Sequence, residues 1–516
     1  MLHPHFHAKT RPDHPAVIMA STGETISFGQ LEVRSNQIAH LMRSHGLQRG
    51  DHMAFLLDNH VRFFDLVWGA TRAGLYFTPI SYYLQPDEIE YIINNCHAKV
   101  LVVAEKFSDK IKPILEKIPE VKVCYMMDGV QAPFQSWEQA TAAMPTTPIA
   151  DESEGREMLY SSGTTGRPKG IKFPLSEGGL GEAPDIVRSV GLAQFMGVNH
   201  ETVSLSTSPL YHSAPLGFAT GCHRLGSTVV IMEKFDEEKA LQLIEKYKIA
   251  YSQWVPTMFV RLLKLPEAVR QKYDVSSMKF AIHGAAPCPA EVKQKIMAWW
   301  GPVLWEFYSG SERNGIFMVS PQEWLAHPGT VGKCVDAKVH IVDDETGEEL
   351  PAGQIGTIYC SQGTNFDYHG DADKKKSITI RDGWTTIGDV GYLNADGYLF
   401  LTDRKSYMII SGGVNIYPQE TEDCLITHDK VFDVAVFGVP HPEMGEEVKA
   451  VVQPMNWQEV GPALEKELIE FCRSKISAIK CPRSIDFERE LPREETGKIK
   501  KRLIKDRYWQ AGQSIG

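Results

Sequence analysis

The sequence predicts an α/β protein with parallel sheet, and three observations indicate this class. Short apolar segments alternate with stretches of helical periodicity up to about residue 300. Several of these segments are apolar without interruption, as strands buried on both faces are. The chain has 516 residues, more than one compact core normally holds, so we expect at least two domains.

The first helix is expected over residues 27–45, because Ser27 is a suitable N-cap and Gly46 follows the last periodic residue. The elements expected after it alternate in type. They are strand 52–59, helix 60–73, a strand from 75 that ends at Pro79, strand 98–105, strand 227–232, a helix from near Asp236, strand 279–284 and helix 289–300.

After about residue 330 the pattern changes to strands joined by turns. Residues 338–360 predict two strands around a Gly/Pro turn, and residues 391–405 predict a hairpin with an Asp-Gly turn. Mixed α and β patterns then return, with a helix expected near 462–476. We place a domain boundary near 402–406, which leaves a small α+β unit at the C-terminus.

Composition excludes several classes of protein. Hydrophobic residues make up 43% and charged residues 23% of the chain, which is typical of globular proteins. The formal net charge of −11 argues against a non-specific nucleic-acid binder, which needs a surplus of Lys and Arg. Nine scattered cysteines without a C-x-x-C pair indicate a reducing compartment and no structural zinc.

The N-terminus has no apolar signal-peptide core, and no apolar run approaches 18 residues. We therefore expect a cytoplasmic protein without a membrane span. His3, His5 and His7 could bind a metal adventitiously, but no carboxylate or cysteine nearby completes a site. A frayed tail is the expected structure there.

The segment 160–172, YSSGTTGRPKGIK, is the strongest functional signal. Three glycines let the backbone turn sharply, four Ser/Thr hydroxyls add donors, and Arg167 and Lys169 add positive charge. Converging N–H groups, hydroxyls and cations suit a polyphosphate; the alternative is a solvated loop. It is not the P-loop of kinases and GTPases, because Lys169 precedes Gly170 instead of Ser or Thr.

Other motifs are weaker alone. The small residues of 283–289 would let a flat ligand approach, or would serve close packing. Tyr308 can stack on a base and Glu312 can hold Mg²⁺ beside phosphates, although both fit a surface loop. Asp389 can grip two ribose hydroxyls or make an Asx-turn. The basic segment around Lys498 also fits a solvated tail.

Together and in this order, these motifs resemble the adenylate-forming superfamily of acyl-CoA synthetases, adenylation domains and beetle luciferases. The resemblance covers essentially the whole chain, and segments 73–102 and 383–405 look like family segments. HGAAPCP and WWGPVLWEFYSG most resemble bacterial fatty-acid and bulky-acid CoA ligases. The resemblance implies layered α/β subdomains and a small β-barrel-like subdomain in residues 1–402, a hinge at 403–406, and a mobile α+β lid domain in 407–516.

The resemblance implies two half-reactions. A carboxylate attacks the α-phosphate of ATP to give an acyl-adenylate and pyrophosphate, and the thiol of coenzyme A then displaces AMP. The first step brings an anion to a polyanion, so cations and positioning should dominate its catalysis. The expected partners are the small-molecule acid, ATP and CoA, but no nucleic acid; a homodimer is an open option.

Site residues carried over from the resemblance fall into four groups. Those for the phosphates are Ser161, Ser162, Gly163, Thr164, Thr165, Gly166 and Lys169; those for adenine and ribose are Gly284, Ala285, Ala286, Tyr308, Asp389 and Arg404; those for Mg²⁺ are Glu312 with Thr164 or Thr165, next to Ser311; and those implied in catalysis are Lys498, Thr165, Glu312 and His212. Lys498 would bridge the acyl carboxylate and the α-phosphate.

In the second half-reaction the C-terminal domain would rotate, so that Lys498 leaves and Gly412 and Gly413 line the pantetheine tunnel. The candidate acid-pocket residues are Tyr211, His212, Phe218, Trp254 and Gly284. No charge recurs among these segments, which disfavours an amino acid and favours a fatty, aromatic or polycyclic acid. A merely packed His212 is the alternative.

The sequence departs from the family pattern at three positions. Ser311 replaces the usual Thr, Arg313 stands where small residues are commoner and would face the phosphates or solvent, and Ser406 occupies the hinge. The Gly- and Pro-rich segment 173–185 is expected as an exposed loop near the acid entrance.

Other functions remain open. An adenylation enzyme could load a carrier protein in trans, since this chain has no carrier attachment site of its own. A binder with a decayed site is disfavoured because Lys498, Glu312 and Asp389 are all present. Luciferase-type oxidation cannot be read from these motifs, and the chain lacks a peroxisomal Ser-Lys-Leu ending.

Overall fold

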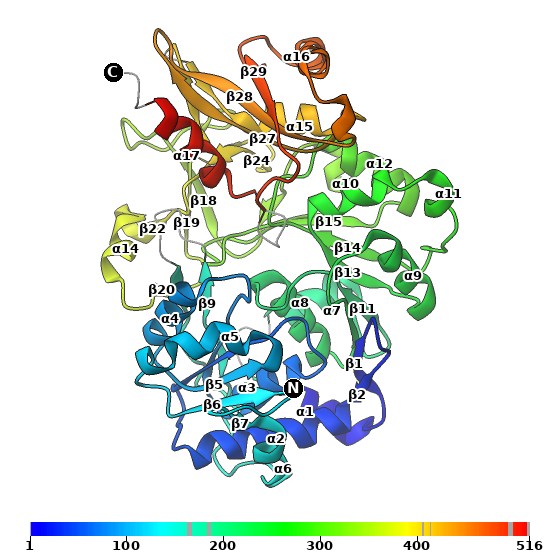
Figure 1. Cartoon of the computed structure of the whole chain (residues 1–516), viewed down its shortest axis with the longest axis vertical. Helices are drawn as coiled ribbons and strands as arrows, with labels where there is room; N and C mark the ends of the chain where they lie inside the picture. The colour runs from blue at the N-terminus through cyan, green and yellow to red at the C-terminus, as the bar shows by residue number, and fades with distance from the viewer. Residues whose placement is uncertain are drawn as a thin grey trace. The chain divides into compact units, whose positions relative to one another are not determined.

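A computed structural model describes residues 2–161, 168–182, 187–404, 407–412, 414–493 and 499–512. The chain divides into two compact units, each with helices and strands mixed (Figure 1). The first unit comprises Met1–Gln253, Glu267–Ala281 and Asn365–Ser377, and the second Trp254–Pro266, Ile282–Thr364 and Ile378–Gly516. Among the described residues, no helix is both long and apolar enough to cross a membrane.

The first unit contains a six-stranded sheet in the order β7-β6-β5-β3-β4-β8, and every pair in it is parallel. The strands are β3 (His52–Leu56), β4 (Tyr76–Pro79), β5 (Ala98–Ala104), β6 (Val123–Met127), β7 (Gln135–Ser136) and β8 (Arg156–Glu157). β3 and β4 are buried along their whole length, which confirms the parallel sheet expected from uninterrupted apolar runs.

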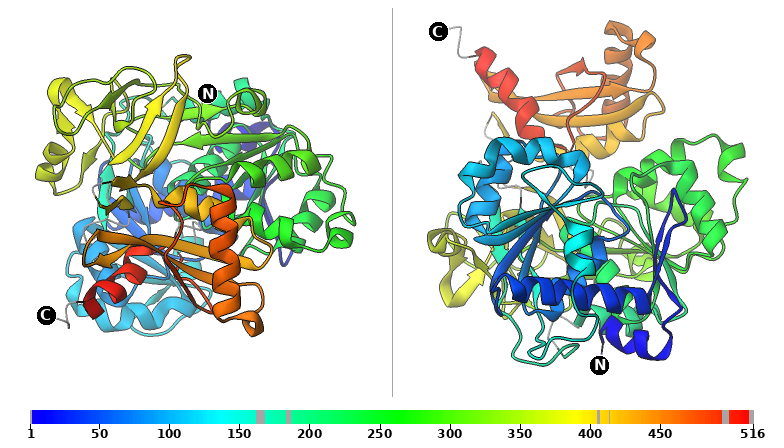
Figure 2. Two further views of the ribbon diagram at one scale, coloured as in Figure 1. Left: turned by 90° about the horizontal axis from the view of Figure 1, so that it is seen from above. Right: turned by 60° about the horizontal axis from the view of Figure 1, so that its bottom comes forward.

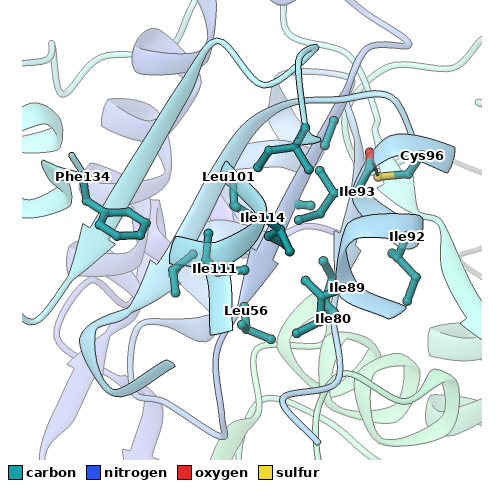
Figure 3. Close-up of a cluster of buried hydrophobic side chains, with 14 of the residues drawn as sticks. Leu56, Ile80, Ile89, Ile92, Ile93, Cys96, Leu101, Ile111, Ile114 and Phe134 are labelled. Atoms are coloured by element: carbon teal, nitrogen blue, oxygen red, sulfur yellow. Dashed lines mark hydrogen bonds between the residues drawn. The ribbon is translucent and has the colours of Figure 1, made fainter. Parts of the chain in front are cut away.

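Helices cover both faces of this sheet (Figure 2). Successive residues of a strand point to opposite faces, so alternate residues meet different helices. Leu56 and Leu101 join the buried cluster of Figure 3 with α4 (Pro86–Asn95) and α5 (Ser108–Ile111). Phe55 points to the other face, where its ring meets Phe63 of α3 (Phe63–Arg72) edge-on at 5.2 Å. α3 is buried at all ten positions, because α2 (Phe28–Ser44) packs over it.

The expected start of α2 is confirmed in detail. The Ser27 side chain accepts from the Gln30 N–H, and the Gln30 side chain accepts from the Ser27 N–H, which makes a capping box. Gly46 follows the helix with φ +75°, the left-handed conformation that favours glycine after a helix end.

The prediction of a frayed N-terminus is wrong. Residues Pro4–Thr10 form α1, and His3 caps it with 1% of its surface exposed, its ring edge-on to Trp68 at 5.0 Å. His5 Nδ1 lies 2.8 Å from Glu32 Oε1, and His7 Nε2 lies 2.9 Å from the Arg224 carbonyl. These histidines therefore dock the first helix onto the unit.

The first unit contains strands of two further sheets. One set is the run β2-β1-β12-β11-β13, which is part of a nine-stranded sheet, and the other is the sheet β20-β10-β9. Their strands are β1 (Pro15–Met19), β2 (Thr25–Ser27), β11 (Val203–Ser206), β12 (Thr228–Ile231), β13 (Tyr251–Trp254), β9 (Leu159–Ser161), β10 (Lys169–Lys172) and β20 (Asp367–Tyr368). The helices of the first unit include α7 (Val187–Met196), α8 (Ser213–Arg224) and α9 (Glu237–Tyr247). α9 begins near Asp236 as expected, and the Asp236 side chain caps it.

The second unit includes the last residues of β14 (Phe280–His283) and the segment that follows them. β15 (Leu304–Tyr308), β16 (Phe317–Val319) and β17 (Lys333–Cys334) pair in antiparallel order. Three helices accompany them: α10 (Pro256–Lys264), α12 (Ala290–Trp300) and α13 (Pro321–Ala326).

The strands predicted after residue 330 form an antiparallel sheet, β21-β22-β19-β23-β24, with β18 on β19. β18 (Lys338–Val342) pairs with β19 (Gly356–Ser361), and β23 (Asp389–Leu393) pairs with β24 (Leu399–Arg404), so both expected strand pairs are confirmed. β21 spans Thr379–Ile380 and β22 spans Trp384–Thr385.

The C-terminal part forms its own sheet, β26-β25-β28-β27, with β29 parallel to β28. The strands are β25 (Ile409–Ser411), β26 (Val414–Ile416), β27 (Val431–His441), β28 (Gly445–Pro454) and β29 (Ser484–Phe487). Alternate residues of β27 pack under α15 (Pro418–Ile426) and α16 (Pro462–Lys475), or under α17 (Lys501–Gly512). The mixed α/β class with a smaller C-terminal part is confirmed; its exact boundaries and its mobility stay predictions.

Candidate functional site

The second unit brings Tyr308 and Asp389 together from segments 81 residues apart. Tyr308 ends β15 and Asp389 begins β23, and the tyrosine hydroxyl donates to Asp389 Oδ2 at 2.6 Å. Only 6% of Asp389 is exposed. Across the β23–β24 pair, Asp389 stands opposite Arg404, whose side chain lies outside the described residues. Three of the six residues predicted for adenine and ribose therefore share one neighbourhood.

Gly284 follows β14 and packs directly on the neighbouring strand. A Cβ at this position would lie 2.6 Å from the Phe307 carbonyl oxygen and 2.6 Å from its ring, so no side chain fits without a backbone shift. Ala285 has φ +69° and is exposed, and Ala286 is half-buried. Two small side chains therefore follow directly after Gly284, which packs on the strand that carries Tyr308. Small side chains at this place leave room for a flat ligand.

Glu312 lies in the turn after Ser311. A Cβ on Gly310 would meet Glu312 Oε2 at 2.8 Å, so the carboxylate folds back over that glycine. Arg313 has φ +52° and is only 6% exposed. The option that Arg313 faces solvent is therefore wrong.

The predicted phosphate loop is described only at its two ends. Ser161 ends β9 and Lys169 begins β10, and the two residues are direct partners in an antiparallel pair. Lys169 Nζ lies 5.9 Å from the centre of the Tyr368 ring. Ser162, Gly163, Thr164, Thr165 and Gly166 fall outside the described residues, and their roles stay predictions.

In the first unit, His212 precedes α8 and its ring packs on Tyr211 with ring centres 4.3 Å apart. Its Nε2 is buried and has no hydrogen-bond partner among the described residues. Burial lowers the pKa of His212 to about 3, so the imidazole is neutral at pH 7. A neutral, buried ring nitrogen without a partner is available to a ligand group.

Sequence reasoning missed Tyr82 in this neighbourhood. Its ring lies edge-on to Tyr211 at 5.5 Å and stacked on Phe107 at 5.1 Å, so it extends the aromatic surface of Tyr211 and His212. The Tyr82–Tyr83 doublet was the available signal, but tyrosines also occur in protein cores.

The other two aromatic candidates differ in burial. Phe218 on α8 is half-buried, with its ring centre 6.3 Å from that of Tyr251. Trp254 has no exposed surface and packs between Phe259 and Trp300, at 5.8 and 5.2 Å. Its surroundings are those of a core residue, and its place in an acid pocket stays a prediction.

The segment predicted to line the pantetheine tunnel is described in part. Gly412 has φ +56° and donates its N–H to the Met444 carbonyl at 2.8 Å. A Cβ there would lie 2.4 Å from Met444 Cε, so the position favours glycine by conformation and space. Gly413 and Lys498 lie outside the described residues.

Comparison with known proteins identifies the family of the chain. The AMP-binding enzyme family model matches residues 5–367, and the model of the AMP-binding enzyme C-terminal domain matches residues 420–498. One relative is a fatty acid–[acyl-carrier-protein] ligase, ScoC, of Streptomyces coeruleorubidus, 29% identical over 98% of this chain and 95% of its own length. Another is a putative acyl–CoA ligase, YdaB, of Bacillus subtilis, 28% identical over 96% and 97%.

Solved structures share the fold across nearly the whole chain. ATP-bound MatB from Rhodopseudomonas palustris is 27% identical with a TM-score of 0.81, covering 98% of this chain and 99% of its own. The anthranilate CoA ligase AuaEII in complex with anthranoyl-AMP has a TM-score of 0.86 at 24% identity, covering 99% and 97%. From the family matches over both parts of the sequence, the chain belongs to the AMP-binding enzymes, the superfamily of adenylate-forming acid ligases.

Proposed function

We propose that this enzyme is an ATP-dependent, AMP-forming acid–CoA ligase that activates an apolar carboxylic acid. The observation that carries the proposal is the Tyr308–Asp389 contact at 2.6 Å beside Gly284, because it joins an aromatic ring, a buried carboxylate and a bare backbone where a nucleoside needs them. Relatives named as acyl-CoA, long-chain fatty-acid and 4-coumarate ligases support the reaction type.

Each group would have a distinct task in the first half-reaction. Ala285 and Ala286 would admit the adenine against Tyr308, and Asp389 would accept from the ribose hydroxyls. These contacts would fix the α-phosphate relative to the acid, and such positioning can supply much of the rate enhancement. Lys498 would approach that phosphate and offset the repulsion between the two anions.

Glu312 is the described carboxylate best suited to Mg²⁺. Mg²⁺ in nucleotide sites is usually held by one or two protein carboxylates together with substrate phosphates and water. The described residues contain no group of three His, Cys, Asp or Glu placed to hold a metal by themselves, which fits a cation that arrives with ATP. When bound, Mg²⁺ would neutralise part of the negative charge of the phosphates.

The acid is expected to be apolar because Tyr82, Tyr211 and His212 present aromatic surface without a formal charge at neutral pH. A neutral His212 could donate to or accept from the acid's polar end. Fatty and hydroxycinnamic acids, named among the substrates of relatives, both meet this description.

A second acceptor is favoured by one observation. The fatty acid–[acyl-carrier-protein] ligase is 29% identical over nearly the whole chain, slightly above the CoA ligases. We therefore keep transfer to a carrier protein as the alternative for the second half-reaction.

The experiment has two stages. A panel of fatty, hydroxycinnamic, polycyclic and amino acids is first scored by ATP-dependent pyrophosphate release. The best acid is then offered with either CoA or a phosphopantetheinylated carrier protein, and thioester is measured directly. We expect an apolar acid and CoA; preference for an amino acid, or thioester only on the carrier, would overturn the respective half of the proposal.

A further inference from the structure

A buried charged cluster lies behind the predicted adenine loop. It consists of His283 at the end of β14, Glu306 in β15 and Lys293 on α12. The Lys293 and His283 side chains have no exposed surface and that of Glu306 has 7%. Lys293 Nζ donates to Glu306 Oε2 at 2.7 Å, and His283 Nε2 lies 3.7 Å from the same oxygen.

The energetics of this cluster make it an unusual way to stabilise a core. Moving both charged groups out of water costs about as much free energy as their mutual attraction provides. Proteins in which apolar residues replace a buried ion pair are often as stable. Both ring nitrogens of His283 also lack a hydrogen bond among the described residues. Burial raises the pKa of Glu306 against the effect of Lys293, and lowers the pKa of His283 well below its usual value.

The cluster's position gives a reason for its presence. His283 directly precedes Gly284, and Glu306 is two residues from Tyr308 on the same strand, so both nucleoside-binding segments begin at the cluster. Lys293 also lies 4.8 Å from the centre of the Trp324 ring, which connects α12 to α13. One ammonium group thus ties a helix to the strand that carries Tyr308.

We propose that Lys293, Glu306 and His283 are positioning residues for the adenosine end of the nucleotide. A hydrogen bond between ions has a short, directed geometry that apolar packing lacks. The cluster therefore fixes the separation between the loop from Gly284 and the strand end at Tyr308, between which the base would lie. This inference rests on the proposed function for the place of the base, but not on the acid or the thiol acceptor.

The test compares a single and a double variant by calorimetric binding of ATP and of AMP. Lys293→Met leaves Glu306 as a buried, unpaired charge and should lower the unfolding temperature. Lys293→Met with Glu306→Leu removes both charges and should restore stability. We expect both proteins to bind ATP and AMP about tenfold or more weakly, the scale seen when residues that orient a binding group are lost.

The equal loss for ATP and AMP is the decisive readout, because AMP lacks the β- and γ-phosphates and reports on the adenosine end. Glu306→Gln provides a second, smaller change should the single lysine variant not fold. Arg72→Met is the matched control: Arg72 is also fully buried and pairs with Glu32 at 2.6 Å in the first unit, so stability should fall without a change in nucleotide affinity.

Wild-type affinity for both nucleotides in the folded double variant would overturn the proposal and make the cluster a matter of stability alone. Weaker ATP binding with unchanged AMP binding would also overturn it, since the effect would then lie at the phosphates. If the enzyme binds ATP but forms no thioester with any acid, the proposed function fails. The loss of ATP and AMP affinity in the cluster variants would still support the positioning role of the cluster.

Discussion

The residues that we propose for the nucleotide side and those that we propose for the acid side of this enzyme are of different kinds. On the nucleotide side, Gly284 is confined by the Phe307 backbone and Asp389 is held by a directed hydrogen bond from Tyr308. On the acid side, the rings of Tyr82, Tyr211 and Phe218 each pack against another aromatic ring. The family is described by its binding of AMP, whereas its members are named for different acids. We therefore expect directed contacts to determine nucleotide binding and the size of the pocket to determine the choice of acid.

This contrast predicts which substitutions act on all substrates and which act on some. Changes on the nucleotide side should affect every acid by the same factor. Changes on the acid side should alter the ranking of acids while nucleotide affinity stays constant.

Lys498→Ala should give the largest effect. Formation of acyl-AMP should slow by roughly 10²-fold or more for every acid, the scale for losing one pre-placed electrostatic contact. With pre-made acyl-AMP and CoA, the variant should form thioester at nearly the normal rate, because Lys498 would serve only the first step. Single-turnover assays of the two half-reactions measure both values. Equal damage to both steps would contradict the predicted rotation of the C-terminal domain.

Gly284→Ala should come next. The new Cβ would meet the Phe307 carbonyl, which cannot move aside as a side chain can, so the loop must shift. A displacement of this kind should weaken ATP binding by roughly 30-fold, within the range for small misplacements. Gly191→Ala is the control, since its Cβ would meet only Phe195 at 4.0 Å. An unchanged dissociation constant for Gly284→Ala would remove this loop from the nucleotide site.

Tyr308→Phe should weaken ATP binding about tenfold. A tenfold change corresponds to about 1.4 kcal/mol, which is close to the contribution of one hydrogen bond to a charged group. The ring remains for stacking, but Asp389 loses the donor at 2.6 Å. Tyr273→Phe removes a similar bond to Glu238 at 2.5 Å in the first unit, and should leave nucleotide affinity unchanged. If the two variants bind ATP equally well, the Tyr308 hydroxyl has no role in the nucleotide site.

The same contrast explains what could be predicted from the sequence. Gly284, Tyr308 and Asp389 lie in short motifs that resemble those of the family, so the amino-acid sequence alone identifies them as candidates. The docked N-terminus could not be predicted, because the partners of His5 and His7 lie 27 and 217 residues away along the chain. The cluster around Lys293 is equally hidden in the sequence, since a lysine on an amphipathic helix resembles a solvated one.

Trp254 shows the limit on the acid side. An aromatic residue at the end of a strand has the same appearance in the sequence whether it faces a ligand or a core. The structure surrounds Trp254 with Phe259 and Trp300 and leaves none of it exposed, whereas Phe218 remains half-buried.

The smallest effect is expected from Phe218→Ala, and it separates the two aromatic candidates. Because Phe218 is half-buried, its truncation should cost little stability. The ratio of kcat/KM for bulky acids to kcat/KM for small acids should change by roughly fivefold, which is less than we expect for a fully enclosed side chain. Trp254→Ala should instead lower the free energy of unfolding by about 3–5 kcal/mol, as expected for a large buried aromatic. An acid panel and chemical denaturation, run on both variants, measure the two effects. A shifted acid profile in a stable Trp254 variant would place that ring in the pocket after all, and an unchanged profile in Phe218→Ala would remove α8 from it.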